Sequence, residues 1–143
     1  MPIRILVADD HQATRTAIAS LVRNSGQDWE ICGEAEDGQA AVEKAAELKP
    51  DLLIIDLMMP QRDGISAGRA IRAQVPTVSV LLYTLWVSEF LQAEARAAGL
   101  QAVVQKSNAA SLLSAIREAV AHRDSSPSDG GGPSAFLTGP RPS

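Results

Sequence analysis

The chain alternates five short apolar runs with five longer amphipathic stretches. The apolar runs occupy residues 3–8, 29–35, 52–55, 78–83 and 102–105. The run over residues 3–8 is typical of a strand that is buried on both faces of a sheet, whereas residues 29–35 indicate a weaker strand. After each run, apolar residues recur at helical spacing, over residues 14–22, 40–48, 66–73, 88–98 and 108–121. This order predicts an α/β fold: a doubly wound, five-stranded parallel sheet with five helices on its two faces.

Size and composition exclude several classes of protein. The 143 residues fit one domain, and the net charge of −4 argues against direct nucleic-acid binding. A single cysteine, Cys32, excludes a disulfide framework, and with only His11 and His122 a histidine-built metal site is not expected. No apolar run approaches the ~20 residues of a membrane-spanning helix, and no apolar leader is found. We therefore expect a cytoplasmic protein without membrane contact.

The composition changes near residue 122. The last part of the chain is rich in Ser, Pro and Gly and includes three consecutive glycines at 130–132. Such a segment has too little apolar surface to order itself. We therefore expect a folded domain over residues 1–121 and a flexible tail or linker over residues 122–143.

Polar side chains stand where the predicted strands end. In a parallel sheet these carboxyl ends lie at one edge, where open α/β sheets bind their ligands. The residues are Asp9, Asp10, Asp56, Thr84 and Lys106. Each alone would be an ordinary turn or capping residue, but three carboxylates at one edge repel one another unless a cation holds them. Oxygen ligands favour Mg²⁺, with Mn²⁺ as a substitute, and such an ion recruits phosphate oxygens.

A carboxylate beside such an ion can serve as the nucleophile of phosphoryl transfer. Asp56 is the candidate, because its strand lies between the acid pair and the Thr84 and Lys106 positions. The hydroxyl of Thr84 can donate a hydrogen bond to a phosphoryl oxygen, and the ammonium of Lys106 can neutralise another.

These residues resemble the receiver domain of bacterial two-component response regulators, over residues 3 to about 121. The matching segments are Asp9-Asp10, residues 56–60, Asp63-Gly64, Thr84 and Lys106-Ser107. Residues 32–35, Asp37-Gly38 and Gly99 are most similar to the nitrate/nitrite-type subfamily, whose members usually carry a helix-turn-helix output domain. The resemblance implies a flavodoxin-like sheet with strand order 2-1-3-4-5.

The resemblance also implies a metal site. Asp10 and Asp56 would ligate Mg²⁺ directly, together with the backbone carbonyl of Met58. Asp9 would act mostly through metal-bound water.

It further implies a phosphorylation-controlled switch rather than an enzyme acting on a separate substrate. Asp56 would accept a phosphoryl group from a sensor histidine kinase. Thr84 and Lys106 would bind that group and report it to the surface of the fourth helix, fifth strand and fifth helix. The domain would phosphorylate itself on Asp56 and lose the phosphoryl group slowly.

Three positions depart from the pattern of the family. Val103 stands where the family usually has a Tyr or Phe that rotates inward when the Thr hydroxyl moves. Either the valine leaves the coupling to the output surface unaffected, or the coupling is weakened or rerouted. Met58 and Trp86 stand two residues after Asp56 and Thr84, where small or polar groups are frequent. Two large apolar side chains there are expected to hinder the hydrolytic water, although Trp86 is also interpretable as a partner contact.

Other interpretations stay open at this stage. A phosphate-independent, receiver-like interaction scaffold is the main alternative. A metal-dependent phosphatase is disfavoured, because Met58 occupies the place of its general acid. The output is either a separate downstream protein or a C-terminal domain beyond this chain, and we expect a monomer or a weak homodimer.

Overall fold

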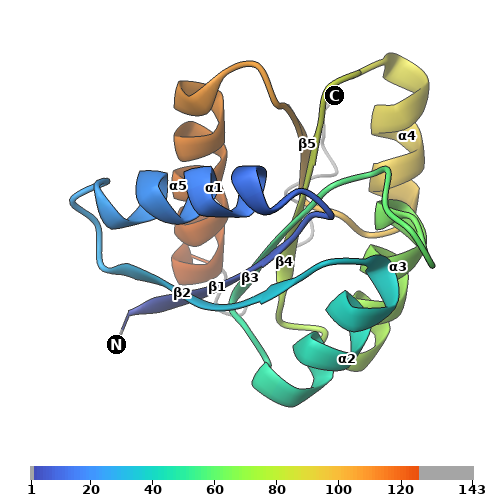
Figure 1. Cartoon of the computed structure of the whole chain (residues 1–143), viewed down its shortest axis with the longest axis horizontal. Helices are drawn as coiled ribbons and strands as arrows, with labels where there is room; N and C mark the ends of the chain where they lie inside the picture. The colour runs from blue at the N-terminus through green and yellow to red at the C-terminus, as the bar shows by residue number, and fades with distance from the viewer. Residues whose placement is uncertain (1, 126–143) are drawn as a thin grey trace.

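The computed structural model describes residues 2–125 and contains one five-stranded parallel sheet (Figure 1). The strands follow the order β2-β1-β3-β4-β5. Their bounds are β1 Ile3–Ala8, β2 Trp29–Ala35, β3 Leu52–Ile55, β4 Ser79–Thr84 and β5 Ala102–Gln105. The doubly wound fold class and the strand order expected from the sequence are both confirmed.

Helices cover both faces of this sheet. They are α1 Gln12–Arg23, α2 Gly38–Leu48, α3 Gly64–Gln74, α4 Glu89–Ala97 and α5 Ala109–Ser125. α1 and α5 lie on one face, and α2, α3 and α4 lie on the other (Figure 1). Among residues 2–125, no helix combines the length and the apolar character needed to span a membrane.

The two apolar cores follow from the alternation of side chains along the strands. In β1, Leu6 belongs to the core under α2 and α3, whereas Ile5 and Val7 belong to the core under α1 and α5. In the four-residue strand β3 every side chain is buried, with Leu53 on one side of the sheet and Leu52 on the other. Strands with both faces covered must be apolar throughout, which explains the uninterrupted runs.

Two elements differ from the expected bounds. β4 begins and ends one residue later than its apolar run, so Thr84 is the last residue of the strand itself. α5 continues to Ser125, beyond residue 121 at which the apolar pattern ends. The Arg123 side chain explains part of this extension, because its guanidinium donates to the carbonyl and the carboxylate of Asp51, at 3.1 and 3.0 Å. Residues 126–143, most of the expected tail, lie outside the described residues.

Side-chain caps begin four of the helices, and the cap of α5 is Asn108, whose Oδ1 accepts a hydrogen bond from the N–H of Ser111 at 3.2 Å. Asp37, Asp63 and Ser88 accept hydrogen bonds from the backbone N–H three residues later, at 2.7, 2.9 and 3.0 Å. Such caps satisfy N–H groups that the helix itself leaves without a partner. The cap at Ser88 confirms the start expected for α4.

Gly64 allows α3 to begin directly against the end of β3. Its N–H donates to the Leu57 carbonyl at 2.9 Å. A Cβ atom at this position would lie 2.3 Å from the carbonyl oxygen of Asp56 and 2.9 Å from the Leu82 side chain. The carbonyl belongs to the sheet edge and cannot rotate away, so only glycine fits.

We predict that Gly64→Ala lowers the unfolding free energy by about 1–3 kcal/mol, the usual cost of overpacking a tight site. Gly68→Ala is the matched control in the same helix, because its nearest contact, at 3.0 Å, is the flexible end of Leu100. Better helix propensity, worth up to about 1 kcal/mol, offsets that contact. Urea unfolding of both variants checks this, and equal losses would contradict it.

Candidate functional site

Backbone hydrogen bonds carry the site residues to one edge of the sheet. The N–H groups of three site residues continue the parallel ladder one step beyond the strands. The bonds run from Asp9 to Ala35 (3.0 Å), from Asp56 to Ala8 (3.0 Å) and from Lys106 to Thr84 (2.8 Å). Asp9 and Asp56 therefore follow adjacent strands, whereas Lys106 follows β5 and reaches them past the end of β4.

The centre of the site is the ammonium group of Lys106. Its Nζ lies 2.9 Å from Oδ2 of Asp9 and 3.3 Å from Oδ1 of Asp56. Asp9 and Asp56 are 1% and 6% exposed, so both carboxylates are largely removed from water. Thr84, 2% exposed, is the third buried polar residue among those described. Buried charges persist only when they are paired, and Lys106 pairs two at once.

This environment shifts the proton affinity of both partners. Burial raises the pKa of Asp56 above its ordinary value; the charge of Lys106 opposes the shift and that of Asp9 adds to it. Burial alone would lower the pKa of Lys106. The hydrogen bond to Asp9 and the charge of Asp56 outweigh it, so the pKa of Lys106 is raised.

The acid pair adjoins a histidine. Nδ1 of His11 lies 3.1 Å from Oδ1 of Asp10, and the backbone N–H of His11 donates to Oδ1 of Asp9 at 2.9 Å. Asp9, Asp10 and His11 each offer a ligand atom within 4.8 Å of the others. The donors are mostly carboxylate oxygens, the set that hard divalent cations prefer, so the residues fit Mg²⁺. His11 was missed as a neighbour of this group, although it directly follows the acid pair in the sequence.

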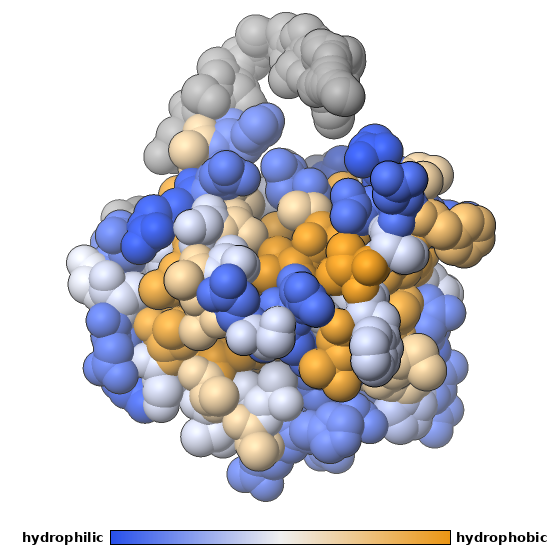
Figure 2. All heavy atoms as spheres, turned by 90° about the horizontal axis from the view of Figure 1, so that it is seen from above, coloured by the Kyte–Doolittle hydropathy of each residue, from blue (hydrophilic) through white to orange (hydrophobic). Residues whose placement is uncertain are grey.

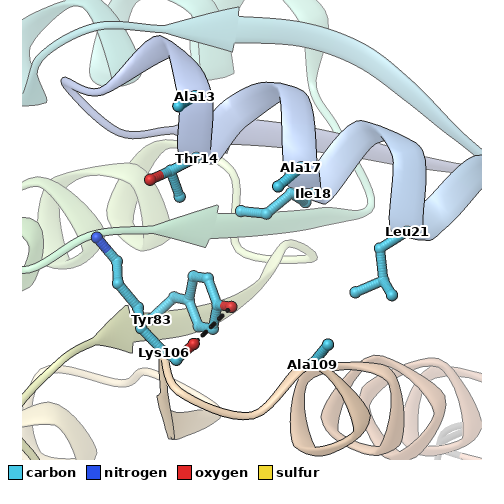
Figure 3. A pocket seen from close by; sticks show the side chains of 8 residues that line it. All are labelled: Ala13, Thr14, Ala17, Ile18, Leu21, Tyr83, Lys106 and Ala109. Atoms are coloured by element: carbon cyan, nitrogen blue, oxygen red, sulfur yellow. Dashed lines mark hydrogen bonds between the residues drawn. The ribbon is translucent and has the colours of Figure 1, made fainter.

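Lys106 also borders a pocket between α1 and the start of α5 (Figure 3). The pocket measures about 300 Å³, and small or apolar side chains of α1 form one wall. The Tyr83 ring lies opposite them, with its hydroxyl 3.4 Å from the Lys106 carbonyl, which it approaches as a donor. Tyr83 therefore contacts the backbone of Lys106 from the side of the pocket.

The structure separates the predicted residues into two groups. Asp9, Asp56 and Lys106 are in direct contact, with Thr84 buried at the end of the neighbouring strand. Asp10 is exposed, and its Oδ1 lies 3.1 Å from Nδ1 of His11.

Large apolar side chains are exposed at this end of the sheet. Seen from above, hydrophobic atoms gather near the middle of the face and hydrophilic atoms surround them (Figure 2). Four large apolar residues are exposed in the segments that follow β3 and β4: Met58, Leu85, Trp86 and Phe90. Met58 and Trp86, the two positions noted in the sequence, are 71% and 81% exposed.

Comparisons with known proteins agree with this geometry. Residues 5–117 match the response regulator receiver domain family. The response regulator protein VraR of Staphylococcus saprophyticus is 34% identical over 119 residues, which cover 82% of this chain and 56% of that protein. The chain thus spans about half the length of the curated relatives it matches.

Solved structures show the same architecture. The response regulator domain of Thermotoga maritima CheB has a TM-score of 0.78 and 32% identity, covering 85% of this chain and 98% of that one. The receiver domain of the putative response regulator NarL from Mycobacterium tuberculosis has a TM-score of 0.76 and 28% identity, covering 82% and 94%.

We predict that Asp56→Asn stabilises the metal-free protein at neutral pH and raises its melting temperature by a few degrees. A carboxyl group whose pKa is raised on folding stabilises the fold only while it is protonated, so the parent loses stability as the pH rises through that pKa. The difference between variant and parent should therefore be full at pH 7–8 and fade toward about pH 4.

Thermal unfolding between pH 4 and 8 measures this difference. Glu47→Gln removes an equal charge from an exposed position of α2 and serves as the control. A lower melting temperature of Asp56→Asn at pH 7 would mean that attraction to Lys106 outweighs the cost of burying Asp56.

Proposed function

Because this chain belongs to the family of response regulator receiver domains, we propose that Asp56 is the phosphoacceptor of the switch. Receiver domains are the phosphorylation-dependent signalling switches of two-component systems. The observation that carries the assignment is the bridge from Lys106 to the buried carboxylates of Asp9 and Asp56. It is the arrangement that a transferable anionic group would need: a nucleophile with a cation beside it.

Asp9, Asp10 and Asp56, with the backbone carbonyl of Met58, would hold Mg²⁺, and Mn²⁺ could replace it. When bound, the ion would neutralise phosphoryl oxygens. The fit rests on the donor set, which combines three carboxylates with a backbone carbonyl.

The chain's own residues would perform the transfer in one displacement. An oxygen of the Asp56 carboxylate forms a bond to phosphorus while the bond from phosphorus to the kinase histidine nitrogen breaks. The leaving imidazole keeps the electron pair. Thr84 donates its hydroxyl to a phosphoryl oxygen, and Lys106 places its ammonium against another. Small phosphate donors such as acetyl phosphate would react in the same way.

The signal would leave through α4, β5 and α5. Lys106 follows β5 directly, so a change in its contacts acts on the strand between the two helices. Val103 in β5 is half-buried and has no ring to swing, so we assign the response to displacement of the segment between Thr84 and α4.

The partners we propose are a cytoplasmic sensor histidine kinase, in keeping with the response-regulator names of the relatives, and an output that regulates transcription. A phosphate-independent scaffold would have no use for buried Asp56 and Thr84 beside the ammonium of Lys106, and no observation favours it.

We expect the protein to gain one phosphoryl group when it is incubated with acetyl phosphate and Mg²⁺. Intact-mass spectrometry detects the gain. Asp56→Asn should abolish it, whereas Asp51→Asn, at the opposite end of β3, should not. Labelling that persists in Asp56→Asn would assign the phosphoacceptor elsewhere, and beryllofluoride binding by NMR gives a second measurement in the absence of turnover.

We also expect slow loss of the phosphoryl group, because Met58 and Trp86 present apolar surface beside the water's approach. The double variant Met58→Asn with Trp86→Glu should lose it roughly tenfold faster, a smaller gain than the roughly 10²–10⁴-fold that a fully positioned acid or base contributes. Phe90→Glu makes a similar change at an exposed apolar residue of α4 and should keep the parental lifetime. An unaltered lifetime in the double variant would refute this explanation.

A further inference from the structure

Arg15, in the first turns of α1, connects three parts of the site edge. Its guanidinium donates to the backbone carbonyl of Asp9 at 2.6 Å and to Oε1 of Glu34 at 2.8 Å. The Arg15 side chain is 11% exposed, so most of it is covered by neighbouring groups, whereas its partner Glu34 is 44% exposed. Neither Arg15 nor Glu34 belongs to the phosphoacceptor site described above.

The Asp9 carbonyl is the atom that orients the peptide between the two acids. The N–H of Asp9 is fixed by Ala35, and its carboxylate is fixed by Lys106 and by the backbone of His11. The carbonyl is the remaining polar group of the residue, and Arg15 holds it. Because this carbonyl shares a planar peptide with the N–H of Asp10, fixing it also fixes where the Asp10 backbone leaves β1.

Arg15 and Glu34 together form a clamp on the Asp9 carbonyl, and Glu34 anchors the end of this clamp that lies away from Asp9. It lies in β2, opposite Val7 of β1, and its backbone carbonyl accepts a hydrogen bond from the ammonium group of Lys44 in α2. The clamp therefore connects the turn after β1 to an ordered strand and, through that strand, to a helix.

The charges of the clamp explain why it is a pair. A lone arginine beside the acid group would repel a divalent cation and would also oppose the dipole at the start of α1. The carboxylate of Glu34, 2.8 Å from Nε of Arg15, offsets the charge of the guanidinium. A second N–H of the same group still donates to the Asp9 carbonyl.

We propose that Arg15 and Glu34 form a positioning pair that sets the divalent-cation affinity of the acid group by fixing the peptide between Asp9 and Asp10. The proposal rests on the metal site of the proposed function but not on phosphoryl transfer. Partners that orient metal ligands typically change affinity 10–100-fold when they are removed.

The test is a titration of the ¹⁵N-labelled protein with MgCl₂ alone, followed by the amide shifts of the site residues. Arg15→Lys keeps the positive charge but loses the planar guanidinium, whose two nitrogen atoms donate to Glu34 and to the Asp9 carbonyl. The double variant Arg15→Gln with Glu34→Gln keeps the net charge of the pair and loses both hydrogen bonds. Each should raise the Kd for Mg²⁺ about tenfold, and a purely electrostatic role would leave both Kd values unchanged.

Arg123→Lys is the matched control. Arg123 also donates to a backbone carbonyl and to a carboxylate, both of Asp51, but at the opposite end of the sheet. It should lose stability in urea to a similar extent and keep the parental Kd. Because the amide spectra also report whether each variant is folded, a stability loss is separated from an affinity loss.

Each outcome decides the matter. If the parent binds Mg²⁺ and both Arg15 variants bind it equally well, the positioning pair is wrong while the metal site stands. If Arg123→Lys weakens binding as much, the effect is general destabilisation and the pair is again wrong. If the parent shows no saturable shift, the metal site of the proposed function fails and the pair has nothing to position.

Discussion

The ammonium of Lys106 between two buried carboxylates is the interaction on which the rest of this site depends. Without it, Asp9 and Asp56 would be two like charges in a poorly hydrated pocket, and one of them would take up a proton. With it, both anions persist at the edge of an apolar sheet, and Asp56 keeps a raised pKa that marks the residual cost. The site is thus prepared for a group that adds positive charge or redistributes negative charge.

The sheet makes this arrangement possible, because its ladder continues into the turns. Asp9, Asp56 and Lys106 each donate a backbone N–H to a neighbouring strand end, so their Cα positions are determined by strand pairing. Gly64 lets α3 close directly behind Asp56, where any larger residue would collide with the carbonyl of the sheet edge. Apolar residues on both faces of β1 and β3 hold these strands in place, and the polar residues of the candidate site are those that follow them.

The strands and the central site residues were predictable, whereas the connections among them were not. Four strands have the bounds that their sequence runs indicated. Burial on both faces leaves a clear apolar pattern in β1 and β3, whereas the edge strands β2 and β5 are only partly buried. α5 runs past its apolar pattern to Ser125, since Arg123 binds Asp51, which is distant in the sequence. Arg15 carried a weak signal: a cation in the first turns of a helix opposes the dipole and calls for a partner.

The sequence by itself determined where strands and helices alternate along the chain and which chemical groups stand at the strand ends. These groups are acids after β1 and β3, a hydroxyl at the end of β4 and an amine after β5. It did so because strand burial and residue identity are local properties. Only the tertiary structure decided which of these groups touch. The pairing of Lys106 with both Asp9 and Asp56, and of Arg15 with Glu34, depends on strand register and on side chains that meet across long separations, which no local pattern encodes.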